Sequence, residues 1–582
     1  MKKLIILLVA LATISSQAWG AIYYVDPDCT DTNPASATVD GTAYDPATPA
    51  CTGGSDSYYV TIADVNLKSF SVGDSILFKK GETWREQLTP PSSGSAGSPI
   101  TFGAYGTGNA PIISGSNLVS GWTVYSGNVY QATLTTEPWV VTFDRTMGIK
   151  ETALGNVNAA YEWFWTGNVL YIYSASGDPD TVYTSPGMEA GQRNWGIFIN
   201  NVDYITVSNL HVYGTNDSAI CSQYEDHLSV DGVTVKFVGP TYYGSAAVDF
   251  HEGSTNASIT NSTIQYTQTD GVWSESANFV ATGNNISHID GPGADGIQTF
   301  NANSITITNN TIDMSDSVTS AKFCITAAGG TGSHIISGNT LTGCPESGIF
   351  TVTVSDIVIS RNLIRNVQGS GYGISIGNEA ATNNTTIQYN VIYGCYVGIM
   401  KNSTYEAKNL NIYNNTIYGI ATTGRGISLG LSPISGKVKN NIVYSGGTCD
   451  GCGVNLGGSS IIGGETFEMD YNIFYPERTN FIRAMNWSTY STLAAWASAT
   501  GYDTHSNKDD PQFVSTVTPD FSLQSSSPAI NAGSSVGLTT DYAGRAVPVG
   551  AAPDIGAYEY GGLSRIKNFL NLRNFPEMKG WR

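Results

Sequence analysis

The side chains best suited to chemistry lie in one part of this chain, between residues 245 and 322. The stretch HIDGPGADGIQTF (288–300) places several ionisable groups among glycines, although only 13% of the 582 residues are charged. An Asp-Gly pair at Asp270 precedes the Asp-Gly pair at Asp295, and Lys322 follows both. Two close carboxyls can act as a general acid and base, and several carboxylates together can bind a cation such as calcium. Either chemistry requires elements that bring these separated residues together.

A repeat supplies such elements. From residue 195 to about residue 477 the sequence repeats itself with a period of roughly 22 to 29 residues. Copies such as DGIQTFNANSITITNNTIDMSD and SGIFTVTVSDIVISRNLIRNVQ begin with a Gly-Ile-like pair and continue as short strands with alternating apolar residues. Repeats of this length without helical periodicity predict a β-solenoid, in which each copy stacks on the next.

Asparagines recur before the third strand of these repeats. They are Asn310, Asn339, Asn362, Asn390, Asn415 and Asn441. Asparagine tolerates the left-handed backbone conformation better than most residues, and stacked turns would let each amide bond to the copies above and below. We therefore predict a structural ladder of asparagines and not a set of ligands.

The repeats resemble the right-handed parallel β-helix of the pectate-lyase-like superfamily, over roughly residues 60–480. The resemblance implies an all-β fold, a right-handed parallel β-helix, and action on an extracellular polysaccharide. For enzymes of the pectate-lyase type it also implies calcium, which binds a uronate carboxylate of the substrate, and a lysine or arginine that removes the neighbouring carbon-bound proton.

The segments that flank the repeats suggest six parts. They are a signal peptide (1–20), an N-terminal cap with the first rungs (21–116), an antiparallel β insertion rich in Tyr and Trp (117–190), the β-helix repeats (191–480), a C-terminal end module (481–560) and a flexible basic tail (561–582). The end module resembles the choice-of-anchor type found in bacterial secreted β-helix proteins. We expect a secreted monomer without a transmembrane segment, with the module available for association with a cell surface.

The net charge limits the binding partners to be expected, and the cysteines predict disulfide bonds. A formal net charge of -20 argues against a nucleic-acid partner, and a polyanionic substrate would need a metal or a basic patch to offset the field. Cys29 and Cys51 flank one loop and predict a disulfide. Cys449 and Cys452 form CDGC, which indicates a local disulfide or two loop thiols. The cysteines within the repeats are interpreted as small packing residues. These are Cys221, Cys324, Cys344 and Cys395.

Side-chain alternation predicts which residues face outward. If Ile297 points into the solenoid, Gln298 and Phe300 point out. The matching outward pairs are Phe198 and Asn200, Cys221 and Gln223, Asp249 and His251, Trp273 and Glu275, Phe350 and Val352, Ser375 and Gly377, and Met400 and Asn402. Asp270 and Asp295 lie at strand entrances, and His288 lies on the turn that leads in. Because adjacent rungs are about 4.8 Å apart, these residues predict one polar patch.

Two reactions fit this patch. In the first, Asp249, Asp270, Glu275 and Asp295 hold calcium, and Lys322 is the base of a β-elimination. In the second, Asp270 and Asp295 are the acid and base of an inverting hydrolase, whose carboxyls lie about 6.5–9.5 Å apart. In both, the substrate-binding residues would be His251, Trp273, His288, Gln298 and Phe300.

The motif GADGI resembles the Asn-Thr-Asp-Gly-Ile-like motif of polygalacturonases, which would give Asp295 a catalytic role. That family's following Asp-Asp pair is missing, because AKFCITAA stands one repeat on, and its Gly-His-Gly is replaced by ESG at 346–348. A polygalacturonase is therefore not expected.

Simpler interpretations remain open. Asp-Gly is a common turn pair, so both aspartates can be turn formers, and the histidines can be ordinary surface residues. A non-catalytic glycan-binding or adhesin-like protein would need only the scaffold and exposed aromatic residues. The leading hypothesis is cleavage of a polysaccharide by calcium-assisted β-elimination, with the hydrolase and the binding protein as alternatives.

Overall fold

The computed structural model describes residues 20–240, 245–317, 322–377, 381–401, 404–420, 423–445 and 451–561. Apart from Gly20 and Gly561, the expected signal peptide and basic tail lie outside these residues, as does Cys449. Asn402, one of the expected outward positions, lies outside them as well.

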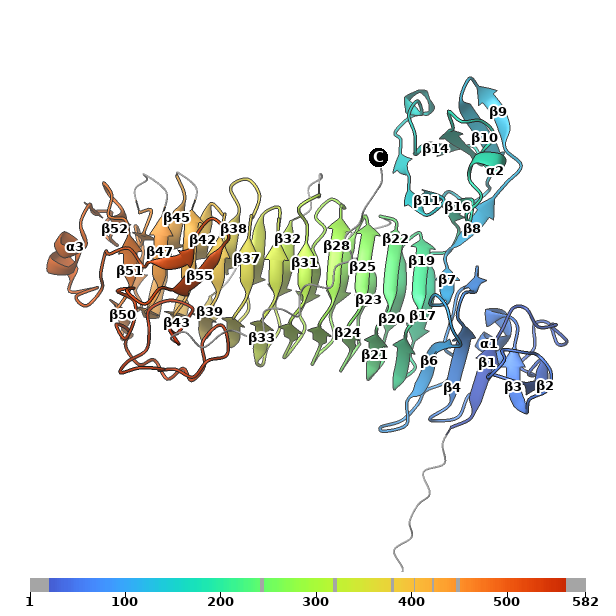
Figure 1. The fold of residues 1–582 in the computed structure, drawn as a ribbon, viewed down its shortest axis with the longest axis horizontal. Coiled ribbons are helices and arrows are strands. Elements are labelled where there is room, and N and C mark those ends of the chain that lie inside the picture. The colour runs from blue at the N-terminus through green and yellow to red at the C-terminus, as the bar shows by residue number, and fades with distance from the viewer. Residues whose placement is uncertain are drawn as a thin grey trace, which may run out of the picture.

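The chain winds into a right-handed parallel β-helix of about 15 turns, which confirms the expected fold class (Figure 1). Over the described residues, three long sheets run along the solenoid, with 18, 13 and 13 strands; here they are called sheets 1, 2 and 3. Along the chain, one turn passes from sheet 3 to sheet 1, then to sheet 2, and back to sheet 3.

Sheet 1 consists of β1 (Ile22–Val25), β2 (Gly41–Tyr44), β3 (Asp56–Tyr59), β4 (Ser75–Lys79), β6 (Ile100–Tyr105), β18 (Ile205–Ser208), β21 (Leu228–Asp231), β24 (Ser258–Thr260), β27 (Val280–Thr282), β30 (Thr306–Thr308), β33 (His334–Ser337), β36 (Ile357–Ser360), β39 (Thr382–Asn383), β40 (Thr385–Gln388), β43 (Ala407–Tyr413), β46 (Pro433–Lys439), β49 (Ser460–Ile461) and β50 (Phe467–Asp470). Sheet 2 consists of β5 (Thr83–Trp84), β7 (Ile112–Ser114), β19 (His211–Thr215), β22 (Thr234–Val238), β25 (Thr263–Thr267), β28 (Asn285–Ile289), β31 (Thr311–Asp313), β34 (Thr340–Thr342), β37 (Leu363–Arg365), β41 (Val391–Tyr393), β44 (Thr416–Ile420), β47 (Ile442–Ser445) and β51 (Ile473–Tyr475). Sheet 3 consists of β17 (Trp195–Asn200), β20 (Ser218–Gln223), β23 (Ala246–Phe250), β26 (Asp270–Ser274), β29 (Ile297–Phe300), β32 (Phe323–Ala328), β35 (Ser347–Val352), β38 (Tyr372–Ile376), β42 (Val397–Lys401), β45 (Arg425–Ser428), β48 (Val454–Asn455), β52 (Ile482–Arg483) and β53 (Thr489–Tyr490).

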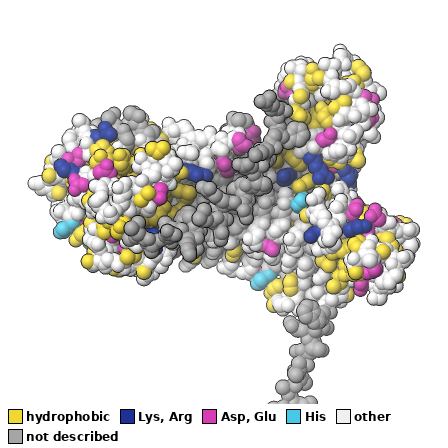
Figure 2. Space-filling model, viewed as in Figure 1, with side chains coloured by type: hydrophobic (Ala, Val, Ile, Leu, Met, Phe, Trp, Pro, Cys, Tyr) yellow, Lys and Arg dark blue, Asp and Glu magenta, His cyan; other side chains and the backbone are white. Residues whose placement is uncertain are grey.

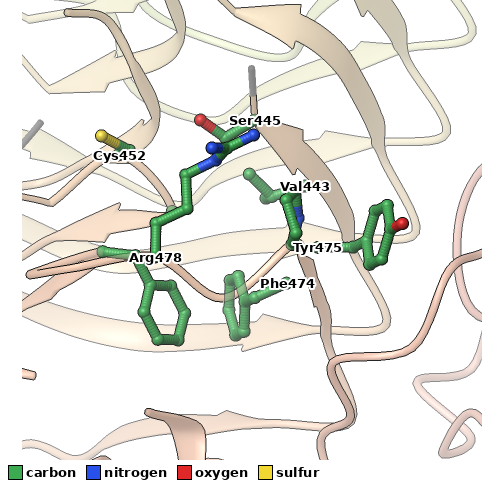
Figure 3. A pocket seen from close by; sticks show the side chains of 9 residues that line it. Val443, Ser445, Cys452, Phe474, Tyr475 and Arg478 are labelled. Carbon is green, nitrogen blue, oxygen red and sulfur yellow. The ribbon is translucent and has the colours of Figure 1, made fainter. Parts of the chain in front are cut away.

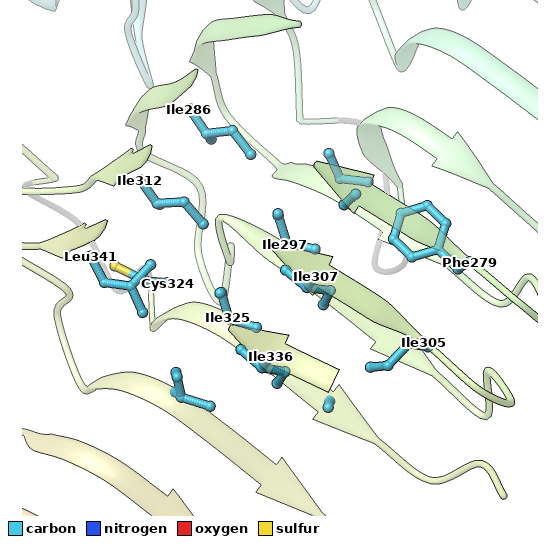
Figure 4. Close-up of a cluster of buried hydrophobic side chains, with 14 of the residues drawn as sticks. Phe279, Ile286, Ile297, Ile305, Ile307, Ile312, Cys324, Ile325, Ile336 and Leu341 are labelled. Atoms are coloured by element: carbon cyan, nitrogen blue, oxygen red, sulfur yellow. The ribbon is translucent and has the colours of Figure 1, made fainter. Parts of the chain in front are cut away.

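The core of the solenoid is a set of aliphatic rows, one side chain per turn. In sheet 3, Val272, Ile297 and Ile325 are aligned in register and are fully buried. They meet isoleucines from the other two sheets inside the solenoid (Figure 4). The Gly296 position has no room for a side chain, because a Cβ there would lie 2.7 Å from Cγ2 of Ile312. A glycine at this position thus lets sheet 3 pack closely on sheet 2.

The asparagine ladder forms at the corner between sheets 1 and 2. Its six predicted members are buried and bond side chain to side chain from turn to turn, and the row extends to Asn284 and Asn472 at its two ends. The backbone reason differs from the one expected. The left-handed conformation belongs to the residue before each ladder position, for example Asn309 (φ 56) and Arg361 (φ 53).

Two short helices close the ends of the core. Ile62 and Val65 of α1 (Ile62–Leu67) and Leu493 and Trp496 of α3 (Leu493–Thr500) belong to the same buried cluster as the solenoid rows. Among the helices of the described residues, none has the length and apolar character needed to cross a bilayer.

An insertion interrupts the first rungs and projects from the N-terminal end of the solenoid (Figure 1). Its elements are β8 (Ser116–Val119), β9 (Thr123–Ser126), β10 (Val129–Thr133), β11 (Val141–Phe143), β12 (Thr146–Met147), β13 (Ile149–Lys150), the 3-10 helix Leu154–Asn156, β14 (Glu162–Thr166), β15 (Val169–Tyr173), α2 (Pro179–Val182) and β16 (Met188–Gly191). They form a five-stranded and a four-stranded sheet, paired mainly antiparallel, around a separate apolar core that includes Trp122 and Trp163.

The C-terminal segment folds back along the outer face of sheet 2. Its hairpin of β54 (Phe513–Ser515) and β55 (Asp520–Leu523) packs aromatic rings against tyrosines such as Tyr418 and Tyr444. After the hairpin, the C-terminal segment is held by the Arg361 guanidinium, which donates to the carbonyls of Thr540 and Asp541.

The cysteines correct one expectation. Cys29 and Cys51 form the expected disulfide, and Cys221 and Cys395 are buried free thiols. Cys324 and Cys344, however, are bonded to each other and are not merely packing residues. Cys324 is the second residue of β32 and Cys344 precedes β35, so the winding of one turn brings their Cα atoms to 5.4 Å, within the range of a disulfide. Cys452 is also disulfide-bonded.

Candidate active site

A cavity of about 960 Å³ opens on the outer face of sheet 3, near the middle of the solenoid. Its lining residues are Pro240, Ser245, Gln268, Thr269, Asp270, Trp273, Pro292, Gly293, Ala294, Asp295, Gln298, Phe300, Lys322, Phe323, Thr326, Ala328, Gly329, Phe350 and Val352. Six residues singled out from the sequence therefore meet here: both aspartates, Trp273, Gln298, Phe300 and Lys322. The volume suits a ligand of a few sugar rings.

The two aspartates stand on adjacent rungs of sheet 3. Asp270 begins β26, and Asp295 lies two residues before β29. Both aspartates line the cavity on the outer face, so their side chains face outward at the strand entrance. Asp270 and Asp295 are only 7% and 2% exposed, although both line the cavity. The turn-former interpretation does not describe Asp270, because it is a strand residue whose side chain lines a cavity.

A short hydrogen-bond network fixes the two carboxyls. Asp270 Oδ1 accepts from the backbone N–H of Asp295 at 2.7 Å, and Asp295 Oδ1 accepts from that of Phe323 at 3.0 Å. With its amide nitrogen turned toward the pair, Gln298 donates to Oδ2 of Asp270 at 3.2 Å and of Asp295 at 3.0 Å. Because one nitrogen reaches both oxygens, these two oxygens lie within about 6 Å of each other.

Burial and mutual repulsion keep a proton on this pair. Burial, the Asp295 charge and the more distant Asp249 raise the pKa of Asp270 well above its ordinary value. Burial raises the pKa of Asp295 to about 7, although the Phe323 N–H and the Lys322 charge act in the opposite direction. The pair therefore retains a proton near neutral pH, and the Lys322 charge favours the ionised form of Asp295.

Lys322 is the cation at this site. It is exposed and directly precedes β32, and its backbone is fixed by hydrogen bonds to Ala294 and Glu346 in the neighbouring rungs, at 2.9 and 2.7 Å. Among the described residues, no carboxylate lies within ion-pair distance of its amine, so its charge acts on Asp295 from a distance.

Four other residues expected at the site lie outside the cavity lining. Asp249 faces outward one rung before Trp273, in register with it, but is 5% exposed and affects the pair only through its charge. His251 and Glu275 lie beside each other, with Nδ1 and Oε1 3.7 Å apart.

His288 is not on a turn beside the pair. It belongs to β28 of sheet 2, where a positive φ of 57 turns its ring onto Tyr266, and its Nε2 is 3.1 Å from Asp316 Oδ2. The sequence pattern does not reveal that the strand continues through His288 to Ile289.

The expected calcium ligands do not form a calcium site. Asp249, Asp270, Glu275 and Asp295 are not among the groups of described residues whose ligand atoms lie within 4.8 Å of one another. All four oxygens of Asp270 and Asp295 already accept hydrogen bonds, whereas calcium requires six to eight oxygen ligands. The donor set of the cavity therefore does not fit this ion.

Phe323 and Phe350 also form part of the cavity wall, which was not predicted from the sequence. Their rings stack at a centroid distance of 4.4 Å and an interplanar angle of 21°, and Trp273 stacks on Phe300 at 5.9 Å. Phe350 was recognised as outward-facing but was given no role. Phe323 occupies the strand-entrance position of Asp270 and Asp295, which would have identified it.

Two other places on the molecule lack such a carboxyl pair. Figure 2 shows Lys and Arg side chains where the insertion meets the solenoid, and there Arg85 pairs with Glu189 at 2.7 Å. A smaller pocket near the C-terminal end of the solenoid is lined by Arg478 with mainly apolar and aromatic side chains (Figure 3).

Comparisons with known proteins agree on the fold. The sequence profile of the family described as "right handed beta helix region" matches residues 246–406. No curated protein sequence matches the chain at a significant level.

Among solved structures, the chain is similar to XylC in complex with xylose, at 12% identity and a TM-score of 0.55, over 93% of this chain and 99% of that one. It is also similar to the lacto-N-biosidase of family GH136 from Eubacterium ramulus (13% identity, TM-score 0.38, over 78% and 64%). The corresponding values for pectate lyase Pel9A are 14%, 0.36, and 93% and 96%. At these identities the likenesses concern the β-helix fold.

Proposed function

We propose that this protein is a secreted glycoside hydrolase that cleaves an extracellular polysaccharide with Asp270 and Asp295. The observation that carries the proposal is the buried carboxyl pair joined by Gln298 at the wall of an aromatic-lined cavity. The disulfides of Cys29–Cys51 and Cys324–Cys344 support export, because such bonds persist in oxidising compartments.

The closeness of the two carboxyls favours a retaining mechanism. Oxygens within about 6 Å leave less room than the 6.5–9.5 Å of inverting enzymes and approach the 5–5.5 Å of retaining ones. Asp270 gives its proton to the leaving glycosidic oxygen while Asp295 attacks the anomeric carbon and forms a glycosyl ester. Asp270 then removes a proton from water, the water oxygen attacks the same carbon, and Asp295 is released as a carboxylate.

A lyase is less well supported. β-Elimination requires that the uronate carboxylate of the substrate be neutralised, and Lys322 is the one cationic residue in the described lining of the cavity. The same lysine would have to act as the base. The overall charge of -20 would also repel a polyuronate.

The test uses the chain from Ala21 onward with xylan, pectate, alginate and 4-nitrophenyl glycosides, with calcium or with chelator. New reducing ends without ultraviolet absorbance of unsaturated uronates, unchanged by chelator, are expected. Absorbance that disappears with chelator would establish a lyase instead. Binding of a glycan without either signal would establish a non-catalytic protein.

Substitutions then identify the pair. Asp295→Asn and Asp270→Asn are expected to lower kcat by about 10³-fold or more, because each removes a group that acts in the transition state. Asp356→Asn, at an exposed carboxyl outside the cavity lining, is the matched control and should retain full activity. Proton NMR of the first-formed anomer distinguishes retention from inversion.

A further inference from the structure

The outer face of sheet 3 is asymmetric about the carboxyl pair. From β26 toward the C-terminus, five consecutive strands each carry one outward aromatic side chain. These are Trp273, Phe300, Phe323, Phe350 and Tyr372. The two strands before β26 carry Cys221 and Asp249 at the position of Trp273 and no outward aromatic residue. Trp195 and Phe198 stack on β17, one strand further from the pair.

The aromatic series continues beyond the cavity. Phe323 lines the cavity and stacks on Phe350 of the next strand, β35. Tyr372 lies on the strand after that, β38, in register with Ser347 of β35. Phe300 is 42% exposed, and the other four rings are partly exposed. Aromatic faces of this kind suit the apolar C–H faces of sugar rings.

The same strands carry no charge on their outer side. The outward residues of β32, β35 and β38 are Phe323, Thr326, Ala328, Ser347, Phe350, Val352, Tyr372 and Ser375. Lys322 and Glu346, which directly precede β32 and β35, have opposite signs. A chain of uronates would therefore meet one lysine, at the entrance of β32, and no compensating charge on β35 and β38, whereas a neutral glycan needs none.

We infer that a neutral glycan chain lies along sheet 3 on the C-terminal side of the carboxyl pair, with β32, β35 and β38 binding three consecutive sugar rings. The spacing supports one ring per strand, because adjacent rungs are about 4.8 Å apart, which is close to the length of one pyranose in an extended chain. This inference rests on the proposed hydrolase function and adds the substrate class and the direction of the chain.

The test measures kcat/KM for a neutral oligosaccharide series of increasing length, beginning with xylo-oligosaccharides because XylC was solved with xylose. The value should rise with each added sugar until the chain reaches Tyr372 and should then stay constant. Phe350→Ala and Tyr372→Ala should each raise KM for the long substrates about fivefold to tenfold, with kcat nearly unchanged. Tyr372→Ala, at a residue outside the cavity lining, should leave the hydrolysis of 4-nitrophenyl glycosides unaffected.

Trp487→Ala is the matched control, because Trp487 is an exposed aromatic residue near the far C-terminal end of the solenoid, outside this series. Hydrolysis that does not depend on chain length, or the same loss from Trp487→Ala, would overturn the inference while leaving the hydrolase in place. Absence of hydrolysis of every neutral substrate would instead overturn the proposed function. Melting temperatures of the variants establish that both alanine proteins are folded.

Discussion

Polar side chains are buried at two corners of this solenoid, and they interact with their neighbours in opposite ways: at one corner they bond to each other, and at the other they repel each other. Between sheets 1 and 2 the same residue type recurs from Asn284 to Asn472, and each amide bonds to its copy in the next turn. Between sheets 2 and 3 the corresponding residue changes from Asp270 to Asp295 to Phe323, and the two carboxyls repel each other.

The difference follows from hydrogen-bonding capacity. An amide both donates and accepts, so stacked copies satisfy one another, whereas stacked carboxylates only accept and need a proton or an outside donor. Gln298 is that donor for Asp270 and Asp295, and the raised pKa values record the remaining cost. Repetition therefore stabilises the scaffold, and a break in repetition creates the chemically active corner.

Breaking the ladder should have the largest effect on stability. Asn284→Ala removes the acceptor of the Ser262 N–H and a donor to the Ile259 carbonyl, all of them buried. Because buried groups without partners each cost about 1–3 kcal/mol, we expect the free energy of unfolding to fall by about 2–4 kcal/mol. Chemical denaturation measures this loss, and kcat of the folded protein should not change.

Asn285→Ala is the control, because Asn285 is adjacent in sequence but exposed on sheet 2. It should change stability by less than about 0.5 kcal/mol. Equal losses from the two variants would show that the ladder carries no special share of the stability.

The same contrast explains what the sequence could predict. A residue type that recurs at the same position of each repeat is visible in the sequence. The asparagine ladder and the register that aligns Asp249, Trp273 and Gln298 were therefore predictable from the repeat. The rung of Phe323 was overlooked because Cys324 stands where the neighbouring rungs have Gly296 and Gly348. The Cys324 disulfide, the turned ring of His288 and the role of Gln298 depend on distances between turns, which no single repeat encodes.

Lys322→Met should change the pH dependence of catalysis without abolishing activity. The Lys322 charge lowers the pKa of Asp295, so its removal raises that pKa above about 7. If Asp295 must be ionised to attack, the acid limb of kcat/KM moves to higher pH by up to about one unit. Activity should then fall up to about tenfold near pH 6 and little near pH 8, whereas a lyase that uses this lysine as its base would lose activity at all pH values.

Lys437→Met provides the comparison for this shift, because Lys437 is a partly exposed lysine on sheet 1 that pairs with Glu468. Its pH profile should match that of the unmodified protein. An identical shift in both variants would indicate an effect of net charge and not of the position beside Asp295.

His334 is a buried polar residue that belongs to neither corner. It is 1% exposed in sheet 1, and neither ring nitrogen has a hydrogen-bond partner. Burial lowers its pKa, and Asp356 offsets this only in part. We expect His334→Leu to raise the free energy of unfolding by about 1 kcal/mol at pH 7.5, because leucine fills the site without an unpaired polar atom.

The pH dependence of this gain tests the argument. Below about pH 6.5 the unfolded chain binds a proton at His334 that the folded protein resists, so this residue makes stability fall as the pH falls. The advantage of the leucine variant should therefore be larger at pH 5 than at pH 7.5 when both proteins are denatured in parallel. A constant difference between the two proteins across this range would mean that the folded structure accommodates the charged imidazole, and that an unsatisfied buried group need not oppose the stability of the solenoid.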